Sequence, residues 1–199
     1  MGKLVISENV SLDGVVQDPT GEEGFARGGW FLQVADQDRE AWAKLEFDEA
    51  RAAEALLLGR RSDEFFAARW LSRSGEWADR LNSMPKYVMS SRIKEPKWSN
   101  STVLKGDVVH EVSKLKEQLD GDIVVYASAQ LVHTVLEHDL VDELRLTVFP
   151  VVVGAGVRLF GATSDKKPLR LIESRTVGDG LAFLVYQPVR DASARRTRA

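Results

Sequence analysis

The chain has 199 residues, of which 44% are hydrophobic and 29% charged, and its formal net charge is −3. This length predicts one ordinary domain with a sizeable core, and the charge argues against a nucleic-acid binder that relies on a basic surface. There is no cysteine, so disulfides, thiolate metal sites and a cysteine nucleophile are excluded, and the three histidines have no metal-ligand spacing, so we expect no metal.

The first half of the chain alternates predicted strands with predicted helices. The pattern predicts strands over 3–10, 55–59, 86–90 and 101–106, and helices over 37–55, 62–70 and 107–119. Between the first strand and the first helix lies a glycine-rich loop. Ser62 is the expected N-cap of the second helix, followed by Asp63 and Glu64 in the favourable first turn.

The second half continues the alternation and then ends in a hairpin. We expect a buried strand over 122–127, a helix over 128–139 that Ser128 caps, and a strand over 143–149. Residues 169–177 and 181–189 flank the turn Gly178-Asp179-Gly180, which favours an antiparallel hairpin. The sequence therefore predicts an α/β fold with three αβα layers, in which a mostly parallel sheet is closed by the hairpin. We assign one domain over 1–189 and expect 190–199 to be a disordered tail.

Three predicted strands end in residues suited to an anion. These ends are "GRRS" from Gly59, "SSR" from Ser90, and "ASAQL" from Ala127. Each also has a plain structural interpretation: a helix cap, a polar loop and a helix start. Because ligands of parallel sheets bind beyond the carboxyl ends of the strands, the three together favour a nucleotide that carries a 2′-phosphate. Neither G-x-G-x-x-G nor a Walker lysine loop is present.

Three quoted segments resemble a known family. The strings "GRRSDEFF", "YVMSSR" and "YASAQLVHTVLEHDLVDELRLTVFPVVVGAGVRLFG" are similar to the dihydrofolate reductase superfamily. They most resemble the branch that contains the reductase domain of bifunctional riboflavin-biosynthesis enzymes and its stand-alone bacterial relatives. The resemblance covers residues 3–189 and implies the dihydrofolate-reductase-like form of the predicted fold.

The resemblance also implies NADPH as the hydride donor and assigns residues to it. The implied cofactor-binding residues are Gly59, Arg60, Arg61, Ser62, Ser90, Ser91, Arg92, Ala127, Ser128, Gln130, Leu131 and Gly154. The family commonly has glycine at position 127. Alanine there resists a positive φ, which puts the geometry of the cofactor turn in question.

On the substrate side, Asp13 is the implied catalytic residue, in the loop after the first strand. We expect it to be half-buried with a raised pKa, suited to relaying a proton; the alternative is an Asp-Gly turn. Trp30 and Phe149 are predicted to bind substrate. Trp30, Phe31 and Trp42 are candidates for an apolar wall against a planar ring, and the alternative, favoured for each residue individually, is core packing. Glu46 and Asp48 are interpreted as a solvated helix face.

Three functions follow from these features. The first is an NADPH-dependent reductase of a small planar heterocycle, either a pterin or a pyrimidine of the 5-amino-6-ribosylamino type. The alternatives are a reductase of an unrelated carbonyl or quinone, and a non-catalytic nucleotide-binding or dimerisation module. The apolar hairpin and the resemblance predict a homodimer. Without a signal peptide or a long apolar run, we expect a cytoplasmic protein that binds neither membrane nor nucleic acid.

Overall fold

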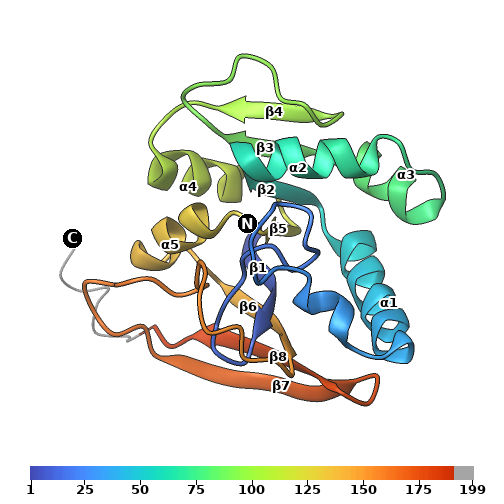
Figure 1. Cartoon of the computed structure of the whole chain (residues 1–199). Coiled ribbons are helices and arrows are strands. Elements are labelled where there is room, and N and C mark those ends of the chain that lie inside the picture. Colours follow the sequence, from blue (N-terminus) through green and yellow to red (C-terminus); the bar gives the residue numbers. More distant parts are fainter. Residues whose placement is uncertain (191–199) are drawn as a thin grey trace.

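Eight strands form a single mixed sheet in the computed structural model, which describes residues 1–190 (Figure 1). The strands are β1 (Lys3–Ser11), β2 (Ala55–Gly59), β3 (Lys86–Met89), β4 (Ser101–Leu104), β5 (Asp122–Tyr126), β6 (Glu143–Phe149), β7 (Leu169–Val177) and β8 (Leu181–Pro188). Their order across the sheet is β4-β3-β2-β5-β1-β6-β8-β7. The first six run parallel, and β8 and β7 add the antiparallel hairpin.

Helices cover both faces of the sheet, as the predicted three layers require. They are η1 (Trp30–Gln33), α1 (Asp36–Ala52), α2 (Arg60–Trp70), α3 (Glu76–Ser83), α4 (Val108–Gln118) and α5 (Ala129–Glu137). Side chains of α4 and α5 pack with Leu4 and Ile6 of β1. Side chains of α1, α2 and α3 pack with Val5, which the strand alternation points to the opposite face. The predicted fold class is therefore confirmed, and β6 lies inside the sheet between β1 and β8.

The predicted elements differ from the structure mainly at their ends. Helix α2 begins at Arg60, and the extended Gly59 occupies the N-cap position, so the prediction that Ser62 caps this helix is wrong. Ser128 does precede α5, but its side chain makes no capping hydrogen bond. The short helices η1 and α3 were not predicted. Apart from Arg190, the predicted tail lies outside the described residues.

The sheet opens at the end of β5. β5 accompanies β1 only as far as the pair Ser7–Tyr126, whereas β6 follows β1 up to the pair Ser11–Phe149. On its other side β5 pairs with β2 only at Ala55 and Leu56. Because α1 and α5, which follow β1 and β5, cover opposite faces, this opening is where a ligand of an open α/β sheet is expected.

Candidate functional site

The turn between β5 and α5 holds two successive residues in the left-handed region. Ala127 has a φ of 52° and Ser128 a φ of 63°. This conformation costs a residue with a side chain about 1–2 kcal/mol, so contacts around the turn must maintain it. The Ser128 hydroxyl supplies them: its oxygen accepts the Gly59 N–H at 2.9 Å and lies 2.8 Å from the Ser62 hydroxyl. Two of the three predicted cofactor segments are thus in direct contact.

The start of α2 leaves one arginine free of ion pairs among the described residues. Arg60 pairs with Glu64 at 3.0 Å, whereas Arg61 is exposed and makes no such pair. The Asp63 carboxylate is buried and accepts the N–H groups of Lys97 and Trp98 at 2.7 and 3.3 Å. The acidic residues that follow Arg61 are therefore engaged elsewhere, and the positive end of α2 remains available to an anion.

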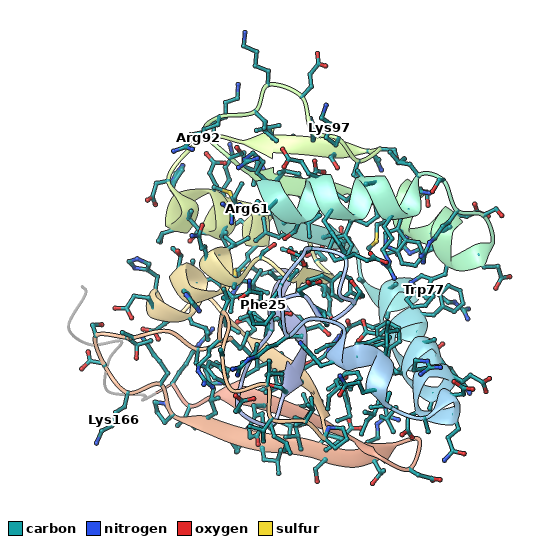
Figure 2. All side chains as sticks on the ribbon, viewed as in Figure 1. Phe25, Arg61, Trp77, Arg92, Lys97 and Lys166 are labelled. Carbon is teal, nitrogen blue, oxygen red and sulfur yellow. The ribbon has the colours of Figure 1, made fainter. Side chains whose placement is uncertain are left out.

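The third predicted cofactor segment follows β3 at the same edge. Gly59 is in register with Met89 across β2 and β3, which places Ser90 beside the start of α2. The Ser90 hydroxyl accepts the N–H of Arg92 at 3.2 Å and stabilises the bend there. Ser91 and Arg92 are exposed. Figure 2 shows Arg61 and Arg92 on these neighbouring elements, α2 and the segment after β3.

Asp13 joins the loop after β1 to the loop after β6. Its carboxylate accepts the Ser11 hydroxyl at 2.7 Å and the N–H groups of Val153 and Gly154 at 3.0 and 2.8 Å, and Arg158 lies 3.6 Å away. The hydrogen bond from Ser11, and then that from Val153, lowers the pKa of Asp13 from 3.8 to about 2. The expected rise is therefore wrong, because these donors stabilise the ionised form.

The rest of the loop after β1 is tied to the same region. Asp18 is 1% exposed and accepts the N–H groups of Glu23 and Phe25, both at 3.0 Å. Arg27 donates to the Val153 carbonyl at 2.8 Å. Phe25, which is labelled in Figure 2, lies against Gly156, whose φ is 118°. The glycine-rich loop and residues 153–157 thus form one connected rim at the carboxyl end of β1 and β6.

The predicted substrate-binding aromatics lie mostly in the core. Trp30 and Phe149 are 1% and 0% exposed, and their rings meet edge-to-face with centroids 5.4 Å apart. Phe31 packs on Trp42 at 4.6 Å. Trp42 is half-buried, and its indole N–H donates to the Asn9 side-chain oxygen at 2.7 Å. Trp30 and Phe149 therefore belong to the core, whereas Trp42 hydrogen-bonds to a polar side chain of β1.

A group of buried polar residues under α1 was missed. Tyr126, Ser7 and Arg145 form one row across β5, β1 and β6. Glu49 of α1 reaches Arg145 at 2.9 Å, with its side chain 8% exposed. The second Glu49 oxygen and the Tyr126 hydroxyl are both buried without a hydrogen-bond partner. Burial, and then the charge of Glu49, raises the pKa of Tyr126.

Glu46 is half-buried and lies close to Glu49, so its interpretation as part of a solvated face is wrong; Asp48 is exposed. Burial, followed by the charge of Glu49, raises the pKa of Glu46 well above its usual value. The spacing of residues along the helix could have predicted that Glu46 faces the sheet. Glu46 and Glu49 lie four and seven residues after Trp42, on the stripe that faces the sheet.

Glu8 was also missed. It lies within β1, is 8% exposed, and has a buried Oε1 without a partner. Burial, and then the charge of Glu46, raises its pKa well above the usual value. Two of the residues with unpartnered buried atoms, Glu8 and Tyr126, thus lie at the end of the β1–β5 pairing.

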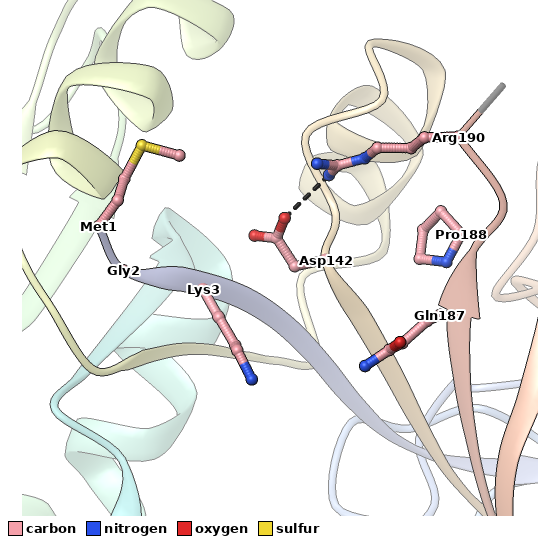
Figure 3. Close-up of a pocket in the computed structure, with 7 residues that line it drawn as sticks. All are labelled: Met1, Gly2, Lys3, Asp142, Gln187, Pro188 and Arg190. Carbon is pink, nitrogen blue, oxygen red and sulfur yellow. Dashed lines mark hydrogen bonds and ion pairs between the residues drawn. The ribbon is translucent and has the colours of Figure 1, made fainter. Parts of the chain in front are cut away.

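A hollow at the opposite edge of the parallel strands has a different character. It measures about 320 Å³ and is lined by Met1, Gly2, Lys3, Asp142, Gln187, Pro188 and Arg190 (Figure 3). Asp142 is ion-paired with Lys116 and, at 2.8 Å, with Arg190. Because these charges are paired, we assign no ligand to this hollow. Within residues 1–190 there is no helix suited to crossing a bilayer and no group of acidic or histidine side chains placed to hold a metal.

One family model matches nearly the whole described chain. The profile of the RibD C-terminal domain matches residues 2–183. The uncharacterised protein YyaP of Bacillus subtilis is 26% identical over 189 residues, covering 92% of this chain and 94% of YyaP.

Solved structures share the fold at lower identity. A putative riboflavin biosynthesis protein from Shewanella sp. PV-4 has a TM-score of 0.70 at 21% identity, covering 94% of this chain and 99% of its own. Dihydrofolate reductase from Enterococcus faecalis, complexed with NADP(H), has a TM-score of 0.56 at 14% identity, covering 94% of this chain and 97% of its own.

Proposed function

We propose that this chain, which belongs to the RibD C-terminal domain family, is an NADPH-dependent reductase that transfers a hydride to a small planar heterocycle. Family and fold support a reductase-type function. The proposal that the donor is NADPH depends on the contact of Ser128 with Gly59 and Ser62. This contact places the start of α2 next to the turn before α5, and together the two form one edge suited to binding an anion.

The described residues fit such a cofactor. The left-handed turn at Ala127 and Ser128 exists despite the alanine, so the geometry that the sequence put in question is present. The starts of α2 and α5, with Gly59, Ser62, Gln130 and Leu131, are proposed to hold the pyrophosphate. Arg61, Ser91 and Arg92, with Arg60 and Ser90 behind them, are proposed to hold the 2′-phosphate and adenine. NADPH, when bound, supplies a hydride.

The substrate is proposed to bind beside the opening between β1 and β5. Trp42 offers an aromatic surface there, and Trp30 and Phe149 support it. Asp13 is proposed to fix the position of Gly154 at the rim, through the hydrogen bonds described above. An acceptor with a pterin or pyrimidine ring suits this site, since it is flat and offers polar ring edges.

Titration calorimetry with NADPH and NADH tests the cofactor. A charge-assisted contact to the 2′-phosphate contributes roughly 1.5–3 kcal/mol, so NADPH should bind more than about tenfold tighter. The Arg92→Ala variant should lose this preference while its NADH affinity stays the same. Arg170→Ala, an exposed arginine on β7, serves as the control. Equal affinity of the wild-type protein for both dinucleotides would contradict the assignment.

The alternatives are a non-catalytic nucleotide-binding or dimerisation module, and a reductase of an unrelated carbonyl or quinone. The first is favoured by one observation, the alanine in the strained turn. Absorbance at the nicotinamide band separates them, with a panel of a dihydropterin, an aminopyrimidine, menadione and an aromatic aldehyde. Binding of NADPH without oxidation by any acceptor would favour the module.

A further inference from the structure

Glu8 lies where the sheet opens. It is the first residue of β1 beyond Ser7, the last residue that pairs with β5. Its other neighbour, β6, continues beside it through Leu146. By the alternation of the strand, Glu8 shares its face with Ile6 and Val10, which belong to the core under α5. An acidic side chain therefore occupies an apolar position next to the gap at the end of β5.

Nothing among residues 1–190 neutralises this carboxyl group. No hydrogen bond or ion pair of its side chain is found there, and its Oε1 is buried without a partner at 8% exposure of the residue. A buried polar group without a partner costs roughly 1–3 kcal/mol, and an ionised one costs more. The group avoids the larger cost by keeping its proton, in agreement with its raised pKa.

The other acids near the opening are less suited to releasing a proton. Asp13 accepts three hydrogen bonds and is ionised. Glu49 is held in an ion pair with Arg145 at 2.9 Å. Tyr126 has a pKa raised above that of an ordinary phenol, so it holds its proton more tightly. Glu46 also has a raised pKa, but it is only half-buried and lies on α1, so it is the alternative donor that the variants below distinguish from Glu8.

We propose that Glu8 is the acid that supplies the proton of the reduction, an inference that rests on the proposed reductase function. The step balances in electrons and protons. The carbon of a C=N bond gains the hydride with its electron pair, the nitrogen gains the proton of the Glu8 carboxyl group, and the nicotinamide is oxidised by two electrons. The Glu8 carboxylate then regains a proton from solvent.

Infrared difference spectroscopy tests the proton on Glu8 without any substrate. The wild-type protein at neutral pH should show the carbonyl stretch of a protonated carboxyl group, and this band should shift when NADPH is added. Glu8→Gln, which is isosteric and neutral, should lose the band. Glu46→Gln should remove only the band of Glu46, whose pKa is also raised, and should keep the band that responds to NADPH. A Glu8 band that does not respond to NADPH would indicate a structural role, and the absence of the band would also overturn the proposal.

Turnover provides the second measurement, with 7,8-dihydropterin as the C=N probe and menadione as the quinone probe. Glu8→Gln should lower turnover of the dihydropterin about 10²-fold at unchanged NADPH affinity, the usual scale for a positioned acid. The loss with menadione should be smaller, since a reduced quinone oxygen holds negative charge better than an amine nitrogen. A larger loss in Glu46→Gln than in Glu8→Gln would move the donor to α1.

The two proposals fail in different ways. A wild-type protein that neither binds NADPH nor oxidises it with either probe would overturn the reductase function and this inference with it. A wild-type protein that does both, with a Glu8→Gln variant that matches it, would overturn the role of Glu8 alone.

Discussion

Replacing Ala127 by glycine should stabilise the protein, although glycine usually destabilises. Ala127 has a φ of 52°, a conformation that costs an alanine about 1–2 kcal/mol and a glycine almost nothing. Glycine lowers the free energy of unfolding by roughly 0.5–1 kcal/mol relative to alanine, because the unfolded chain with glycine is more flexible. The difference is a net gain of up to about 1.5 kcal/mol, which corresponds to a rise in Tm of up to about 6 °C for a chain of this size.

Urea unfolding measures this change directly. The midpoint should rise at a constant m value, which would show that the effect lies in stability and not in compactness. Ala68→Gly is the matched control, since Ala68 is exposed inside α2 and its replacement should cost about 1 kcal/mol. If Ala127→Gly destabilises the protein as much as the control does, the turn is not left-handed and the geometry assigned to the cofactor site is wrong.

Three further changes test other parts of the structure. Burial lowers the pKa of Lys86 from 10.5 to about 8, so the unfolded chain binds more protons than the folded one between these values. The free energy of unfolding should therefore rise from pH 8 to 10.5. In urea titrations, Lys86→Met should flatten that rise. The pKa of Asp13 is lowered, so its contribution is present above pH 3.8 and lost as pH falls through about 2; Asp13→Asn should lack this acid-dependent loss in the same assay. The edge strand β7 exposes Leu171 and Ile172, and we expect a homodimer that forms through this strand. Light scattering should give about twice the chain mass of 22.2 kDa, and Ile172→Lys should reduce the measured mass to that of one chain. A monomeric wild-type protein would contradict the dimer.

The sequence predicted the sheet well because local patterns specify it. Runs such as Leu56–Leu58 are buried on both faces and read as strands without further information. Helix α3 escaped prediction because it has only eight residues, too few for a clear apolar period. Its place is fixed by contacts distant in sequence, such as the Arg80 side chain donating to the Ala50 carbonyl at 2.9 Å.

The candidate site residues were chosen by residue type, and the sequence did not predict their environments. Ser62 and Ser128 each resemble a helix cap in sequence, and only the folded chain brings their hydroxyls within 2.8 Å. Asp13 was expected to be destabilised as an anion, yet two of its donors come from Val153 and Gly154, about 140 positions away. Glu46 is a different case, because its environment could have been predicted. Glu46 lies four residues after Trp42 in the helix, and this spacing places both side chains on the side of α1 that faces the sheet.

Buried polar groups are satisfied at the amino-terminal edge of the parallel strands, whereas several at the carboxyl-terminal edge lack a hydrogen-bond partner. At the amino-terminal edge, Asp142 is satisfied by Lys116, Arg190 and the Leu4 N–H. The four side chains found with unpartnered buried atoms, among the described residues, are Glu8, Thr20, Glu49 and Tyr126. Glu8 lies in β1, Tyr126 lies at the end of β5, and Glu49 reaches the same row from α1, whereas Thr20 lies in the loop between β1 and η1. Each costs stability, and a fold retains such costs together where a ligand can satisfy them. We therefore expect the opening beside β5 to be the place where a ligand binds, and a bound ligand should satisfy the buried Glu8 carboxyl group.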